Sequence, residues 1–191
     1  MGEEAPIVVG VSGASGAPIA MQVLKALAAA RVPVALVVSA GAVALLREEC
    51  GLAPEALTPY ASVVYSDDDL AAPIASGSRA TRGMVVVPCS GSTAAKIALG
   101  LGDTLLTRAA QVHLKERRRL VVVPRETPLP TTLLRHLTTL SELGVVVLDA
   151  APPYYLHPRT VDDQTSYLAG KVLDQFGVPH QLYRGWKSEG A

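Results

Sequence analysis

The first residues able to do chemistry form the run GVSGASG, at residues 10–16, between an apolar segment and a helical pattern. Backbone N–H groups and the helix dipole favour an anion at such a turn. Glycines let the backbone approach that anion closely, and Ser15 offers a hydroxyl. The pattern matches neither the GxGxxG fingerprint nor a Walker loop. By itself it is compatible with a nucleotide site and with a plain tight turn.

A second hydroxyl-rich turn has the sequence PCSGST, at residues 88–93. Ser90, Ser92 and Thr93 lie where a helix is expected to begin, so helix capping, worth about 1 kcal/mol, explains them without a ligand. Two such turns in one sheet also favour contact with a single phosphate-bearing ligand. Both interpretations stay open at this point.

A third candidate is the pair Arg125 and Glu126, in VVVPRETP, between two prolines and directly after an apolar run. Ligands of open α/β sheets bind beyond the carboxyl ends of the strands, which favours a site here over a surface ion pair. Arginine suits a phosphate or a flavin carbonyl, and glutamate suits proton transfer. This pair is therefore interpreted as part of the site.

Two further pairs are less specific. Arg108 and Lys115 are seven residues apart in a helical pattern and therefore share a face, although a solvated charged face is the usual explanation. Tyr154 and Tyr155 follow the last apolar run, in PPYYLHP. Tyr155 can close over a ligand there, or simply pack.

These residues need a scaffold, and Val- and Ile-rich runs alternate with segments of helical period. Such runs are typical of strands covered on both faces, so we expect an α/β fold with a doubly wound, parallel sheet in three layers. Two helices are expected between residues 93 and 118, and the turn-rich stretch 51–83 is interpreted as a functional loop. The expected strands are residues 7–12, 34–39, 62–66, 84–89, 120–125 and 145–150.

Composition limits the class of protein. The 191 residues, 49% of them hydrophobic, predict one domain, residues 1–191, and the balance of 17 basic and 17 acidic side chains gives no field that would recruit nucleic acid. No apolar run is long enough to span a membrane, and the acidic start does not resemble a secretory signal, so a cytoplasmic protein is expected. Cys50 and Cys89 lack metal-ligand spacing. The tail, about residues 178–191, is expected to dock on a neighbouring surface through Trp186.

Taken together, blocks along residues 7–186 resemble the UbiX-like flavin prenyltransferases, the UbiX/Pad family with the HFCD-type flavoprotein fold. The blocks are GASG, the earlier SGS, PCS-x-x-T, RAA-x-x-x-LKERR, VPRETP, P-x-YY-x-x-P and KVLDQFG. The resemblance implies a Rossmann-like sheet of about six strands and a homo-dodecamer built from trimers, with FMN at subunit interfaces. It also implies metal-independent transfer of a dimethylallyl group, from dimethylallyl phosphate or diphosphate, to N5 and C6 of reduced FMN. The product, prenylated FMN, serves a UbiD-type decarboxylase.

The resemblance also implies roles for individual residues. Those matching the FMN site are Gly13, Ala14, Ser15, Ser39, Ser90, Gly91, Ser92, Thr93 and Arg125. Those matching the phosphate site of the prenyl donor are Tyr155 and Lys171. Those assigned to catalysis are Ser15, Glu49, Glu126, Lys115 and Arg108. No metal is implied.

Departures from the family pattern concern the pocket rather than the reaction. Pro18 follows the GASG turn where many relatives have a bulky residue and then Tyr-Gly, and Leu70 replaces a tryptophan of some relatives. Leu156 stands where histidine is common, and Lys171 where arginine is common. These changes bear on the identity of the prenyl donor.

Two alternatives remain open. The related FMN-dependent cysteine decarboxylases use a histidine in the early half of the chain, whereas the first histidine here is His113, and PCSGST replaces their Pro-Ala-Ser-Ala-Asn-Thr-like loop. A non-catalytic carrier of FMN or prenylated FMN would keep most of the same binding residues.

Overall fold

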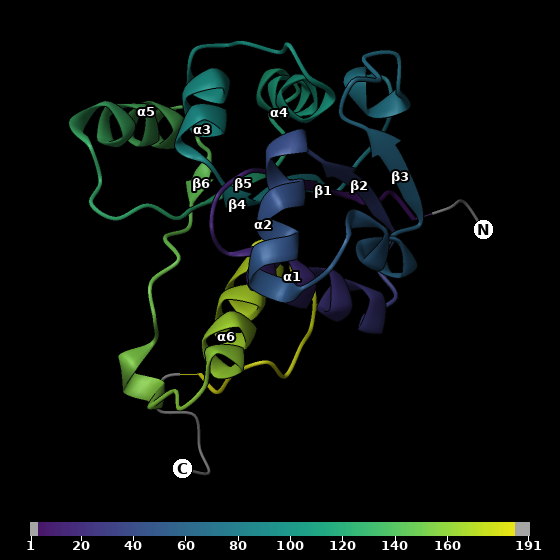
Figure 1. Cartoon of the computed structure of the whole chain (residues 1–191). Helices are drawn as coiled ribbons and strands as arrows, with labels where there is room; N and C mark the ends of the chain where they lie inside the picture. The colour runs from purple at the N-terminus through teal and green to yellow at the C-terminus, as the bar shows by residue number, and fades with distance from the viewer. Residues whose placement is uncertain (1–3, 186–191) are drawn as a thin grey trace.

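A computed structural model describes residues 4–185 of the chain. Its centre is a six-stranded sheet in the order β3-β2-β1-β4-β5-β6 (Figure 1). Every neighbouring pair of strands is parallel. The strands are β1 (Ile7–Val11), β2 (Val34–Val38), β3 (Val63–Ser66), β4 (Gly83–Cys89), β5 (Leu120–Pro124) and β6 (Val146–Val147). The expected α/β class and six-stranded, doubly wound sheet are confirmed.

Helices connect consecutive strands and cover both faces of the sheet (Figure 1). The α-helices are α1 (Ala17–Ala29), α2 (Ala40–Cys50), α3 (Gly91–Ala98), α4 (Leu105–Lys115), α5 (Thr131–Glu142) and α6 (Val161–Asp174). The short 3-10 helices are η1 (Pro54–Tyr60), η2 (Pro73–Ala75) and η3 (Tyr154–Leu156). The two helices expected between residues 93 and 118 are α3 and α4.

Alternating side chains of each central strand enter two separate cores. In β1, Ile7, Val9 and Val11 pack with α1, α2 and α6, whereas Val8 packs on the other face with α4. Because both faces are covered, all five residues of β1 are buried, which explains its continuous apolar sequence. This arrangement is the expected three-layer sandwich.

The edges of the sheet differ from expectation. The last strand spans only Val146–Val147 instead of residues 145–150, because it pairs with β5 alone and the chain then turns away through Pro152 and Pro153. Proline cannot donate to a ladder, so pairing stops before it. The stretch 51–83 holds η1, β3 and η2, and its Leu57 and Ile74 are core residues, so part of this expected loop is structural.

The order of the strands reverses direction between β1 and β4, since the chain winds from β1 outward to β3 and then crosses to β4. At such a switch point the helices that follow the two strands leave on opposite faces, and the carboxyl ends of the strands are the usual ligand site. The turns at residues 10–16 and 88–93 follow β1 and β4, so both lie there.

The C-terminal segment lies on its own chain as far as residue 185. His180 and Tyr183 pack directly on the backbone of Gly170, in α6, where a Cβ atom would come within 2.6 Å of the Tyr183 ring. A side chain at Gly170 would therefore displace this segment. Trp186, which was expected to dock on a neighbouring surface, lies outside the described residues.

Candidate active site at the carboxyl ends of the strands

The two hydroxyl-rich turns are tied together by Ser12. Its buried hydroxyl donates to the carbonyl of Pro88 at 2.9 Å and accepts the backbone N–H of Ser90 at 2.8 Å. The Ser12 N–H also donates to the Pro88 carbonyl, at 3.2 Å. The structure therefore brings the two turns into one site, as the expectation of a shared ligand requires.

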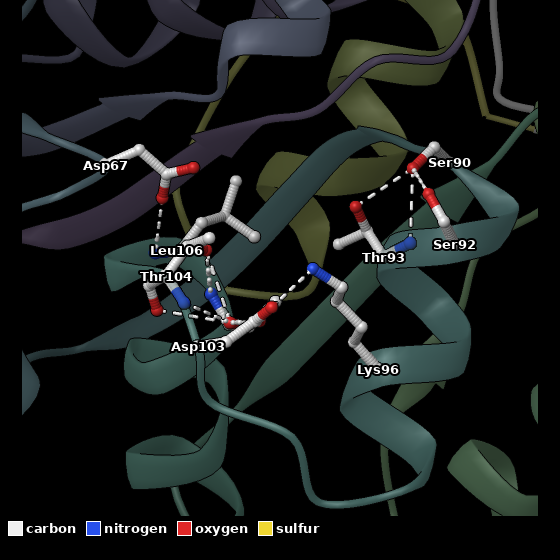
Figure 2. Close-up of polar contacts among 9 residues, drawn as sticks. Asp67, Ser90, Ser92, Thr93, Lys96, Asp103, Thr104 and Leu106 are labelled. Carbon is white, nitrogen blue, oxygen red and sulfur yellow. Dashed lines mark hydrogen bonds and ion pairs between the residues drawn. The ribbon is translucent and has the colours of Figure 1, made fainter.

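Ser90 is the centre of the second turn (Figure 2). Its hydroxyl accepts the N–H of Thr93 at 3.2 Å and thereby caps α3, and it lies 2.9 Å from the Thr93 hydroxyl and 3.1 Å from that of Ser92. The capping interpretation is thus confirmed. Ser92 is exposed, so its hydroxyl can face solvent or a ligand while Ser90 holds the helix.

Gly13 allows the first turn to lie against the start of α2. A Cβ atom at Gly13 would come within 2.9 Å of the Gly41 backbone. Ser39, the N-cap of α2, donates its N–H to the carbonyl of Val11 at 2.9 Å, which places it beside the same turn. The turns after β1, β2 and β4 are therefore neighbours. The close approach of Gly41 was not predicted, because an isolated glycine near a helix start gives no specific signal.

The N-terminus of α1 is occupied by a carboxylate of the chain itself. Glu49 Oε2 accepts the backbone N–H groups of Gly16 and Ala17, each at 2.8 Å. Burial raises the pKa of Glu49, but hydrogen bonds from the Ser15 side chain and these two N–H groups, together with the charge of Arg125, outweigh burial and hold the pKa below its usual value. Within the chain, the carboxylate at the first helical N–H groups of this turn is therefore that of Glu49.

Arg125 and Glu126 lie at the end of β5, beside the first turn. Arg125 Nε donates to the carbonyl of Ser15 at 3.3 Å, and Glu126 accepts the backbone N–H of Thr127 at 3.1 Å. Both side chains are exposed and line a cavity of about 390 Å³ that continues to Asp149, after β6. This places a cation and a carboxylate at the mouth of the site.

Arg108 and Lys115 share a face of α4 but occupy opposite ends of it. Arg108 Nε donates to the carbonyl of Ala75 at 3.3 Å, whereas Lys115 pairs with Glu116 and lies close to Gly77. The N-terminal end of α4 lies near β3, because Asp67 caps it through the N–H groups of Leu105 and Leu106.

Figure 2 shows the Asp67 contact beside the ion pair of Lys96 with Asp103, whose atoms are 2.7 Å apart. Seven residues of helix separate Arg108 from Lys115 by about 10 Å along the axis. Lys115 therefore lies near the start of β5, at the amino edge of the sheet. Within one chain it is not a neighbour of the turns at the carboxyl edge, because α4 runs from one edge to the other.

Tyr155 and Lys171 belong to α6 and the segment before it. The chain leaves the sheet after β6 and extends outward before it enters α6 (Figure 1). Lys171 lies one turn before the end of α6, and the Phe176 carbonyl just beyond that end accepts an N–H of Arg82, which precedes β4. The end of α6 is therefore at the amino edge, so Lys171 is also remote from the turns of its own chain.

The predicted residues thus form separate groups. Residues from the turns after β1, β2, β4 and β5 come together with Glu49, while Lys115, Tyr155 and Lys171 lie elsewhere on the chain. Ser12 was part of the quoted turn but was not predicted as a site residue, since a serine that links two turns has no sequence signal. In the described part of the chain, 4–185, no three His, Cys, Asp or Glu side chains are grouped to hold a metal ion, and no helix is long and apolar enough to cross a membrane.

Comparison with known proteins gives a consistent result. Residues 1–169 match the model of the Flavoprotein family. The chain is 48% identical to the flavin prenyltransferase UbiX of Thermoplasma acidophilum, over 94% of this chain and 99% of that protein. It matches the structure of AnUbiX (PadA1) in complex with FMN and dimethylallyl pyrophosphate, with a TM-score of 0.95 and 37% identity, over 98% of this chain and 100% of that one.

It also matches the dodecameric FMN-dependent UbiX-like decarboxylase of Escherichia coli O157:H7, with a TM-score of 0.93 and 41% identity, over 96% of this chain and 100% of that one. With such similarity over nearly the whole length, the chain belongs to the UbiX-like flavin prenyltransferases, within the Flavoprotein family.

Proposed function

We propose that the protein joins a dimethylallyl group, from dimethylallyl phosphate or diphosphate, to N5 and C6 of reduced FMN and so makes prenylated FMN. The observation that carries this proposal is the site at the switch point, where Ser12 ties the turns after β1 and β4 into one surface. Its relative AnUbiX has been solved with FMN and dimethylallyl pyrophosphate together.

The donor set at this site fits FMN. Gly13 leaves the first turn without a side chain at its tightest point, Ser92 is an exposed hydroxyl, and Arg125 is an exposed guanidinium. Hydroxyls and a guanidinium suit the phosphate and carbonyl oxygens of a flavin nucleotide. When bound, reduced FMN supplies the electron-rich atoms that attack the allyl group. The residues proposed to hold it are Gly13, Ala14, Ser15, Ser39, Ser90, Gly91, Ser92, Thr93 and Arg125.

Ser15 and Glu49 act together in this proposal. The Ser15 hydroxyl is hydrogen bonded to the Glu49 carboxylate, which is fixed by the N–H groups of Gly16 and Ala17. A carboxylate with a lowered pKa is a weak base near neutral pH but a strong hydrogen-bond acceptor. Glu49 therefore orients the Ser15 hydroxyl near N5 rather than removing a proton from the substrate.

Glu126 is the proposed proton acceptor. Bond formation at C6 replaces a C–H bond, so one proton must leave, and the exposed Glu126 carboxylate lines the cavity next to Arg125. The phosphate released from the donor is the other base available to take this proton.

A neighbouring copy is proposed to complete the donor end of the site. Cleavage of an allylic phosphate requires stabilisation of the departing anion, which cations and hydroxyls supply. Lys115, Tyr155 and Lys171 have that chemistry but lie away from the turns of their own chain, and Arg108 lies at the other end of α4 from Lys115. In an assembly such as that of the dodecameric relative, one subunit can offer them to the FMN turns of another.

The product and the setting follow from the reaction. Prenylated FMN is expected to pass to a UbiD-type decarboxylase, which we propose as the recipient. Cys50 and Cys89 are both free thiols, and the proposed acceptor is a reduced flavin, so we place the reaction in the reducing cytoplasm.

The decisive experiment is an anaerobic incubation of the protein with FMN, a reductant and dimethylallyl phosphate or diphosphate, followed by mass spectrometry of the released flavin. We expect a flavin heavier by one C5 unit. If the protein instead binds unmodified FMN in stoichiometric amount with either donor, a non-catalytic FMN carrier is supported. Decarboxylation of a cysteine-containing peptide would support an FMN-dependent cysteine decarboxylase.

A further inference from the structure

The end of α6 carries a polar cluster around Asp174 that the proposed mechanism has not used. The Asp174 carboxylate accepts the hydroxyl of Tyr183 at 2.5 Å, approaches Lys171 Nζ at 3.3 Å and lies 3.0 Å from His180 Nε2. Lys171 comes from the preceding turn of α6, whereas Tyr183 and His180 come from the C-terminal segment. One carboxylate thus joins α6 to that segment.

Tyr183 connects this cluster to a row of aromatic rings. Its ring centroid is 5.0 Å from that of Tyr167, which in turn is 6.4 Å from that of Tyr155 in an edge-to-face arrangement. Lys171 Nζ lies 5.7 Å from the centre of the Tyr183 ring and 3.5 Å from its hydroxyl. Tyr155 and Lys171, the two residues predicted to bind the donor phosphate, are therefore the ends of one packed row.

Gly170 makes this packing possible. A Cβ atom there would lie 2.6 Å from Tyr183 and 2.8 Å from His180, so only glycine lets both rings rest on the helix backbone. The position of Tyr183 beside Lys171 is thus built into the helix sequence, independently of any charge.

The contacts of Lys171 with Asp174 and Tyr183 keep its ammonium group charged and in place. Burial lowers the pKa of Lys171, but hydrogen bonds to Asp174 and Tyr183 outweigh burial and leave the pKa above its usual value. An ammonium group has three N–H donors, and the partners of Lys171 in the described chain are Asp174 and Tyr183. With both side chains of the ion pair 37% exposed, an anion from solvent can reach the remaining donor.

We propose that Asp174 is a positioning residue for the prenyl-donor phosphate: it fixes the Lys171 ammonium, directly and through Tyr183, next to the row that ends at Tyr155. This inference rests on the proposed function, because it takes Lys171 to be a phosphate ligand. Asp174 itself does not contact the donor. A lysine on a flexible stem gains affinity for phosphate when its rotamer is fixed in advance.

The test compares Asp174→Asn with wild type in steady-state kinetics with reduced FMN and varied dimethylallyl phosphate. We expect the KM for the donor to rise about tenfold or more, as for loss of a hydrogen bond between charged groups, while the affinity for FMN stays close to wild type. Asp162→Asn, which removes an exposed carboxylate at the other end of α6, is the matched control and should leave KM unchanged.

A double-mutant cycle separates positioning from general damage. In a Lys171→Met background, Asp174→Asn should change KM by less than about twofold, because the group on which Asp174 acts is gone. If Asp174→Asn does not fold, Tyr183→Phe replaces it in the same cycle. The inference about Asp174 is overturned if Asp174→Asn has the same donor KM as wild type, or if it raises the donor KM equally in the wild-type and Lys171→Met backgrounds. Neither result affects the proposed function. If the wild type makes no prenylated FMN with either donor, the proposed function fails and this inference fails with it.

Discussion

Glu49 accepts the backbone N–H of Gly16 at 2.8 Å, so a side chain at the end of α2 closes the N-terminus of α1. Helix N-termini at strand-to-helix turns often bind phosphate, because their N–H groups lack partners and the helix dipole favours an anion. Here that place is taken by a carboxylate of the chain itself. The contact ties the end of α2 to the turn that carries Ser15.

Glu49→Gln should destabilise the protein and slow prenyl transfer. The amide oxygen can still accept the two N–H groups, but it carries no negative charge at the helix N-terminus, so we expect a loss of about 1 kcal/mol in the free energy of unfolding. Urea denaturation and single-turnover kinetics measure the two effects. Glu48→Gln, on the exposed side of the same helix turn, is the control and should match wild type.

Acid should weaken the wild type more steeply than Glu49→Gln. The folded-state pKa of Glu49 is lowered, so this group stabilises the fold above the pKa that it has in the unfolded chain. That contribution is lost as the pH falls through the lower, folded-state pKa. Denaturation curves from about pH 7 to about pH 3 should show the difference between the two proteins shrinking toward the acid end. A constant difference would mean that the charge of Glu49 does not contribute.

Ser12→Ala should cost more than an ordinary surface substitution. The hydroxyl is buried and bonded to the Pro88 carbonyl and the Ser90 N–H. Its removal leaves the Ser90 N–H without this acceptor, at about 1–3 kcal/mol, while the Pro88 carbonyl keeps the Ser12 N–H. The affinity for FMN, measured by fluorescence titration, should fall as well, because the second turn loses its tether. Ser78→Ala, in an exposed loop, should stay within about 0.5 kcal/mol of wild type.

Gly13→Ala should impair FMN binding although it adds only a methyl group. The new Cβ atom would lie 2.9 Å from the backbone of Gly41, so the first turn or the start of α2 must move. We expect the Kd for FMN to rise about tenfold or more, since such a shift also displaces Ser15. Gly185→Ala, where a Cβ atom would meet open space, serves as control. An unchanged Kd for Gly13→Ala would remove this turn from the flavin site.

Glu126→Gln should bind FMN normally and turn over more slowly. The side chain is exposed and accepts only the Thr127 N–H next to it, so the fold does not depend on its charge. Loss of a general base typically lowers the rate about 10²-fold or more. Anaerobic turnover at full rate would remove Glu126 from the mechanism and leave the departing phosphate as the proton acceptor.

The sequence by itself determined the sheet and its ligand edge. Continuous apolar runs such as that of β1 can be satisfied only by burial on both faces, so the three-layer α/β fold followed from composition and periodicity. The turns after β1 and β4 were recognisable because glycine permits tight turns and serine caps helix N-termini. Ser90 fulfils that local role as the cap of α3.

Only the tertiary structure decided which of the candidate residues meet. Glu49 and Gly16 are 33 residues apart, and their contact depends on how α2 packs beside α1. Arg108 and Lys115 match one helix face, yet the direction of α4 places Lys115 at the other edge of the sheet. The spacing of residues in the sequence predicts which of them share a face of a helix. It does not predict which end of the helix approaches a ligand, because long-range packing sets the direction of the helix.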